Sequence, residues 1–193
     1  MDLNPFGHST YMVHKQFFKL FGGTFRVYDP MGALALYADM KAFKLREDIR
    51  LYSGEDKLHE VLCIKSRHII DISATYDVVD PATQERVGAL RRRGLKSMIQ
   101  DEWVILDNTD QEVGYIQEDS IVLALVRRFL TNLIPQNFHG YMRGVPVLKF
   151  SQNFNPFTLR LSLDFTADTG GYLDRRLGIA AAVLLCAIEN RQQ

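Results

Sequence analysis

One strand-like unit recurs four times in the first part of the sequence, and this repeat is the feature that most restricts the fold. Its copies begin at Phe25, Ile49, Tyr76 and Trp103, at spacings of 24, 27 and 27 residues. Each copy starts with an aromatic or β-branched residue, which favours an extended backbone, and three of them end in an Asp, which can start a turn. This regular series predicts one antiparallel hairpin after another.

The segments between and after these units predict the remaining strands. Turn-forming residues at 29–32, 80–83 and 107–110 lead into strand-like segments, of which Arg86–Leu90 and Glu112–Ile116 are the clearest. Strands are predicted again at Val145–Ser151 and Thr158–Phe165. A long run of hairpins leaves unpaired sheet edges, and closing the sheet into a barrel removes them.

Two segments interrupt the strand pattern. Residues Ile121–Ile134 follow possible capping residues and stop at Pro135, so they predict a helix. Leu177–Ile188 is a continuous apolar run of 12 residues, and Asp174 before it is a candidate helix cap. A helix of that length reaches about 18 Å, which is short of the roughly 30 Å core of a bilayer. The run therefore predicts a helix surrounded by protein, not a transmembrane span.

Composition and charge limit the class of protein. With 47% hydrophobic residues and no linker, the chain is expected to form one mainly β domain of the α+β class over residues 1–193, with its core at about 10–190. Its 23 basic and 23 acidic residues balance, which argues against a nucleic-acid partner. The two cysteines, Cys63 and Cys186, lie in apolar segments, and the N-terminus lacks a secretory pattern. A cytoplasmic protein without disulfides is expected.

No residue spacing is typical of an enzyme. The five histidines form no metal-binding pattern, and the sequence has no nucleophile elbow, phosphate loop or dinucleotide-binding fingerprint. We therefore expect a non-enzymatic protein without a cofactor.

A basic run is the most suggestive local feature. Arg91, Arg92, Arg93 and Lys96 place four cations within six residues near a predicted strand end. Arginine can hold a phosphate through two parallel hydrogen bonds, and each cation near an acidic membrane contributes about 1 kcal/mol. These residues are the candidate site for an anionic phospholipid headgroup. The alternative is a strand end that is charged for solubility.

An acidic turn is a weaker candidate. Asp107, Asp110 and Glu112 lie together on one predicted hairpin turn, and carboxylate oxygens are ligands that Ca²⁺ prefers. The residues lack the order of a helix–loop–helix calcium site, and an ordinary polar turn uses the same residue types. No metal is expected, with calcium at this turn as the alternative.

Several motifs together resemble the LURP-one-related proteins, which belong with the tubby C-terminal domain and the phospholipid scramblases in one superfamily. They are the Phe-Lys-Leu pair at 18–20 and 43–45, the Phe-Arg-Val-Tyr-Asp unit at 25–29, the Val-Gly-Tyr-Ile strand at 113–116 and the apolar C-terminal helix. The resemblance covers about residues 10–190. It implies a closed antiparallel barrel of about twelve strands whose lumen is filled by the C-terminal helix.

The resemblance also implies how the helix would fit and what the barrel would do. Small residues such as Gly178 and Ala181 would let the strands approach, and Leu184 would fill a wider part of the lumen. Because tubby-like domains bind phosphoinositide headgroups through basic side chains, the resemblance and the basic run point the same way.

The leading hypothesis is therefore a cytoplasmic barrel that docks at the membrane surface on anionic phospholipid or on a protein partner. The alternatives are an open barrel that binds a small apolar ligand in its lumen, and an enzyme of unfamiliar type. A lumen filled by the C-terminal helix would leave no room for an apolar ligand.

Overall fold

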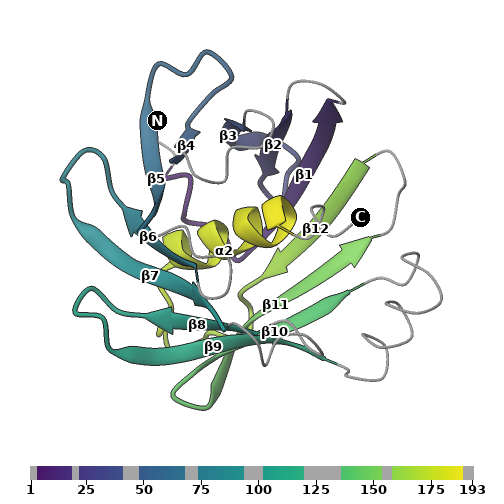
Figure 1. The fold of residues 1–193 in the computed structure, drawn as a ribbon. Helices are drawn as coiled ribbons and strands as arrows, with labels where there is room; N and C mark the ends of the chain where they lie inside the picture. Colours follow the sequence, from purple (N-terminus) through teal and green to yellow (C-terminus); the bar gives the residue numbers. More distant parts are fainter. Residues whose placement is uncertain are drawn as a thin grey trace.

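The computed structural model describes residues 4–18, 22–40, 48–67, 74–93, 102–119, 136–153 and 158–188. Within them, twelve strands form one closed barrel around a single helix, α2 (Figure 1). The strands are β1 (Thr10–Phe18), β2 (Gly22–Tyr28), β3 (Leu34–Met40), β4 (Ile49–Tyr52), β5 (Glu60–Ser66), β6 (Thr75–Val79), β7 (Arg86–Arg92), β8 (Glu102–Leu106), β9 (Glu112–Glu118), β10 (Asn137–Met142), β11 (Val145–Asn153) and β12 (Thr158–Asp164). The helix predicted at 121–134 lies outside the described residues.

The strand order follows the sequence around the whole ring. Each strand pairs antiparallel with its sequence neighbours, and β1 closes the ring against β12 with Thr10 opposite Asp164. Closure leaves no unpaired edge. The predicted barrel of about twelve antiparallel strands around the C-terminal helix is confirmed.

The repeated unit corresponds to every second strand from β2 to β8, and its terminal Asp residues build the turns. The Asp29 carboxylate accepts hydrogen bonds from the backbone amides of Met31 at 2.9 Å and Ala33 at 2.8 Å. Asp80 and Asp107 accept amide bonds in the same way at the ends of β6 and β8. Each Asp thus satisfies backbone donors that the turn would otherwise leave unpaired.

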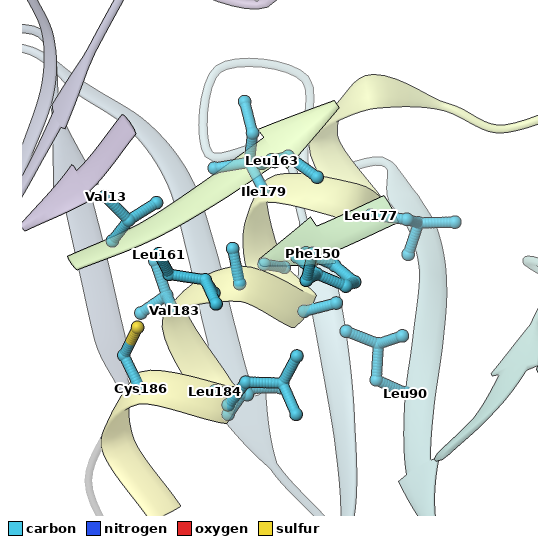
Figure 2. Close-up of a cluster of buried hydrophobic side chains, with 14 of the residues drawn as sticks. Val13, Leu90, Phe150, Leu161, Leu163, Leu177, Ile179, Val183, Leu184 and Cys186 are labelled. Carbon is cyan, nitrogen blue, oxygen red and sulfur yellow. The ribbon is translucent and has the colours of Figure 1, made fainter. Parts of the chain in front are cut away.

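Helix α2 (Arg175–Ile188) lies along the lumen, and its described side chains from Leu177 to Ala187 are buried on every side. The Asp174 carboxylate accepts a hydrogen bond from the Arg176 amide at 2.9 Å, so Asp174 is the predicted N-terminal cap. Figure 2 shows strand side chains facing those of the helix: Val13, Leu90, Phe150, Leu161 and Leu163 lie against Leu177, Ile179, Val183, Leu184 and Cys186.

Two glycines allow the helix and the wall to approach closely. A Cβ atom on Gly178 would lie 2.5 Å from Cζ of the buried Phe165 ring. On β7, a Cβ atom on Gly88 would lie 3.1 Å from the Leu177 side chain. The apolar character of α2 reflects burial in a barrel; within the described residues no helix is long and apolar enough to cross a membrane.

The N-terminus and the C-terminus of α2 lie at opposite ends of the barrel, in different surroundings. The helix begins at the end formed by the turns at 28–34, 52–60, 79–86, 106–112 and 142–145, which we call the turn end and which lies on the left in Figure 1. Near the other end, the buried Lys15 Nζ donates to the Cys186 carbonyl at 2.6 Å. A cation there complements the negative end of the helix dipole.

Candidate functional site

The basic run predicted as an anion site divides between the two faces of β7. Arg91 forms an ion pair with Glu112, and Arg93 lies 2.9 Å from Glu102 and 3.6 Å from Glu112. Arg92 stands opposite the lumen-facing Trp103 in the register, so its side chain leaves the strand on the inner face. Lys96 lies outside the described residues. Strand alternation thus separates Arg92 from its neighbours, and carboxylates of β8 and β9 offset the charge of the other two.

The carboxylates of the acidic turn already have partners. Asp107 accepts bonds from the Thr109 hydroxyl and the Gln111 amide, which lower its pKa. Hydrogen bonds from Arg86 and Arg67 hold the pKa of Asp110 well below its ordinary value. No group of three or more His, Cys, Asp or Glu side chains in the described part of the chain is arranged to hold a metal ion. The geometry does not favour calcium at this turn.

Asp110 belongs to a network of two acids and two arginines on the outer wall. Arg67 contacts Asp77 at 2.6 Å and also Asp110, and Arg86 bridges the same two carboxylates. These side chains are between a fifth and a half exposed, and ion pairs at such positions contribute only about 0–1 kcal/mol each. The network gives the wall over β5–β9 little net charge.

A different charged group lies across β12, β1 and β2. The register places Arg160 opposite His14, and His14 opposite Arg26, all on outward-facing positions of adjacent strands. We call these three residues the Arg160–His14–Arg26 row. Opposed side chains on neighbouring strands have Cβ atoms about 4.5–5.5 Å apart. Three groups that are or can become cationic are therefore brought together from positions 160, 14 and 26.

The row is incompletely neutralised. Arg26 pairs with Glu55 at 2.6 Å and also donates to Gln16, whereas the exposed Arg160 has no ion pair with a carboxylate that the structure describes. Burial first, and then the Arg160 charge, lower the pKa of His14 below its ordinary value. A bound anion would pair with the Arg160 guanidinium and favour the protonated form of His14.

Sequence reasoning missed this row because its members are far apart in the chain. Apolar and polar residues alternate along β12, and this pattern could have shown that Arg160 faces outward, since buried Leu159 and Leu161 flank it. Which strands lie beside β12 depends on the closure between β1 and β12. No local sequence pattern predicts the pairing of β1 with β12.

The turn end is rich in charged side chains. Its turns, together with the loop at 164–176, carry twelve carboxylates and five Lys or Arg side chains. The acids are Asp29, Glu55, Asp56, Glu60, Asp80, Glu85, Asp107, Asp110, Glu112, Asp164, Asp168 and Asp174, and the bases are Lys57, Arg86, Arg143, Arg175 and Arg176. In the described part of the chain six of these carboxylates pair with arginines, and five of those arginines lie outside the counted segments: Arg26, Arg50, Arg67, Arg91 and Arg93. Much of the negative charge at this end is therefore offset.

Two buried nucleophilic groups have no exposed surface from which to act. Cys63 and Cys186 are both buried, and neither forms a disulfide, as predicted. Burial raises the pKa of the Cys63 thiol to about 11, which keeps it protonated near neutral pH.

Comparison with protein-family models, curated proteins and solved structures finds no match. The resemblance to the LURP-one-related proteins therefore stays a prediction, and the functional argument depends on the geometry of this chain.

Proposed function

We propose that this protein is a non-enzymatic docking barrel that binds anionic phospholipid headgroups weakly at a membrane surface. The observation that carries the proposal is the Arg160–His14–Arg26 row, in which three adjacent strands present two arginines and a histidine, and in which Glu55 is the one carboxylate among the described residues that pairs with a member of the row. A lipid phosphate can accept hydrogen bonds from a guanidinium and favour protonation of His14.

Charge distribution supports an orientation. Each basic side chain near an acidic membrane contributes about 1 kcal/mol, so a row of this size supports weak and salt-sensitive binding. The barrel would therefore approach the membrane with the wall of β12, β1 and β2.

The apolar-ligand hypothesis has less support. Helix α2 occupies the lumen, and the strand side chains labelled in Figure 2 belong with those of the helix to one buried apolar cluster. A ligand in the lumen would have to displace the helix, which is buried from Leu177 to Ala187.

The proposal is tested by sedimentation with vesicles that contain phosphatidylserine, compared with vesicles of phosphatidylcholine alone. We expect binding only to the acidic vesicles, and a loss of roughly tenfold or more for Arg160→Glu, which places a carboxylate in the row. Lys149→Glu is the matched control, because it makes the same charge change on the adjacent strand β11, opposite Asp164 and outside the row.

The Arg91→Glu and Arg93→Glu variants separate this row from the basic run of β7. We expect them to reduce binding less than Arg160→Glu does, since their positive charges are already offset by Glu102 and Glu112. Loss of binding in the β7 variants alone would reject the row as the site, and equal sedimentation with both vesicle types would reject lipid docking altogether.

A further inference from the structure

Three segments at the turn end adjoin the strands that carry the Arg160–His14–Arg26 row. They are residues 4–9, which lead into β1, residues 29–33, which follow β2, and residues 165–172, which follow β12, and together we call them the rim. The Phe165 amide donates to the Ser9 carbonyl at 2.8 Å, and the His8 Nε2 atom lies 3.9 Å from the Asp29 carboxylate. The three segments are therefore in contact with one another at one end of the row's strands.

The rim exposes apolar side chains. Among the described residues, four large hydrophobic side chains are exposed: Met31 (79%) and Tyr172 (61%) in the rim, and Leu58 (74%) and Val145 (43%) on other turns. Met31 lies at the exposed tip of the β2–β3 turn, residues 30–33, whose sequence Pro-Met-Gly-Ala has no polar side chain. Single exposed apolar residues are common on soluble proteins. A whole turn tip of this kind needs a further explanation.

The rim exposes almost no charge, unlike the other turns. Among Asp, Glu, Lys and Arg it contains only Asp29 and Asp168, whose side chains are buried. The Asp168 carboxylate accepts the backbone amides of Tyr172 and Leu173, at 2.8 and 3.1 Å. The remaining turns at this end expose charged side chains, among them Glu55, Glu85, Asp110 and Arg143. The rim is therefore the part of the turn end that can approach an acidic surface without exposed carboxylates being repelled.

Tyr28 connects the row to the rim. It is the last residue of β2, and its ring centroid lies 4.9 Å from that of His14. The wall thus presents the cationic row, then a tyrosine, then the uncharged rim with Met31. An acidic bilayer has the matching order of phosphates, an interfacial layer in which tyrosine is favoured, and hydrocarbon.

We propose that the rim enters the interface of an acidic lipid bilayer when the row binds a lipid phosphate, with Met31 and Tyr172 as the side chains that enter. This inference rests on the proposed lipid docking and adds to it the element that contacts the bilayer interior. The row alone would also pair with a soluble phosphate compound. The rim favours lipid in a bilayer, because a soluble phosphate offers no apolar region to cover Met31.

A fluorescent label on the β2–β3 turn tests the insertion. An environment-sensitive dye is attached to the Met31→Cys protein, in which both native cysteines are buried. Ala82→Cys is the matched control, since the amides of Met31 and Ala82 each donate to the Asp two residues before them in an Asp-Pro-x turn. Strand β6, which leads into the control turn, is four strands from β2 around the ring. With vesicles that contain phosphatidylserine, we expect a blue shift for the label at position 31 and none at position 82.

Vesicle sedimentation measures how much the rim contributes to affinity. Met31→Ser with Tyr172→Ser should weaken binding to the phosphatidylserine vesicles by about tenfold. Leu58→Ser with Val145→Ser removes two exposed apolar residues from other turns of the same end and should change the affinity less than about twofold. Raising the salt from about 50 to about 300 mM should weaken every protein, but the ratio between wild type and the rim variant should persist, because apolar contacts are not screened.

The outcomes separate this proposal from lipid docking itself. If wild type sediments with the acidic vesicles but the label at position 31 does not shift, or the two double variants lose binding equally, insertion of the rim is rejected and docking by the row stands. Absence of wild-type sedimentation rejects both. If Met31→Ser with Tyr172→Ser changes the oligomeric state of the free protein and leaves sedimentation unchanged, the rim is a contact between copies of this chain, which also overturns the proposal.

Discussion

The two faces of the barrel wall follow different rules. On β12, Leu161 faces the lumen and is 3% exposed, while the adjacent Ser162 faces outward. An inward side chain must fit against α2, which fills the space enclosed by all twelve strands. Outward side chains on β12, β1 and β2 are less constrained, whereas the outward Ala89 and Val104 of β7 and β8 are buried in a small cluster of their own. The lumen therefore largely determines the fold, and the exposed part of the outer wall is free to carry a function.

The largest expected difference comes from placing a carboxylate on each face of the same strand. Leu161→Asp would bury an unpaired charge against the helix and should cost several kcal/mol, enough to prevent folding. Ser162→Asp should cost less, about 1–2 kcal/mol, because the half-buried Ser162 loses the hydrogen bond that its hydroxyl donates to the Ser151 carbonyl at 3.2 Å while the new group is partly solvated. Urea denaturation followed by circular dichroism measures both. Similar losses for the two variants would contradict the assignment of inner and outer faces.

A smaller inward change tests how tightly α2 fills the lumen. Replacing Gly by Ala normally stabilises a helix by about 1 kcal/mol. At Gly178 the new methyl group would overlap the Phe165 ring, and overpacking of this kind costs about 1–3 kcal/mol. We expect Gly178→Ala to lower the melting temperature, and Phe165→Leu in the same chain to recover part of the loss. A more stable Gly178→Ala protein would show that the lumen has spare room.

The inward face is also the part that sequence analysis predicted. Three of the four repeated units show an aromatic start and a terminal Asp within five residues, so the hairpins of β2–β9 can be seen locally. The run of apolar residues after Asp174 predicts that no face of α2 is exposed to solvent. Strands β1 and β10 carry no such repeat and were not predicted, although β1 closes the barrel.

The outward face was harder to predict because its groups come together through pairing between distant strands. Arg91, Arg92 and Arg93 are contiguous in the sequence and form the obvious candidate, yet alternation and the acids of β8 and β9 divide and neutralise them. Arg160 looks isolated in the sequence and faces His14 only because β12 meets β1. Charge clusters in a barrel depend on register, which no local pattern specifies.

A change on the outer wall should separate function from stability. Arg160→Ser removes a charge that is opposed to His14 and has no described acidic partner, so we expect the free energy of unfolding to stay constant or rise by about 0.2–1 kcal/mol. Sedimentation with acidic vesicles should fall in the same variant. Lys149→Ser, on the adjacent strand β11 and opposite Asp164, serves as the control. Destabilisation by Arg160→Ser would show that the row serves the fold and not a ligand.

The smallest expected effect is the pH dependence that His14 gives to stability. Its pKa is lowered in the folded protein, so between that value and about 6.5 the unfolded chain binds more protons than the folded one. Stability should therefore fall as the pH drops through this window, and His14→Gln should remove that part of the loss. Comparing the unfolding free energies of the two proteins at about pH 7.5 and about pH 5 measures the difference.

Nuclear magnetic resonance titration of the His14 ring identifies the cause of this pH dependence. Arg160→Ser should raise the His14 pKa toward its ordinary value, because it removes the second of the two influences and leaves burial in place. Acidic vesicles should act in the same direction, since an anion held in the row favours the protonated ring. An identical His14 pKa in wild type and in Arg160→Ser would show that the two residues are not coupled across the β12–β1 pairing. This result would contradict the proposal that the row acts as one anion-binding group.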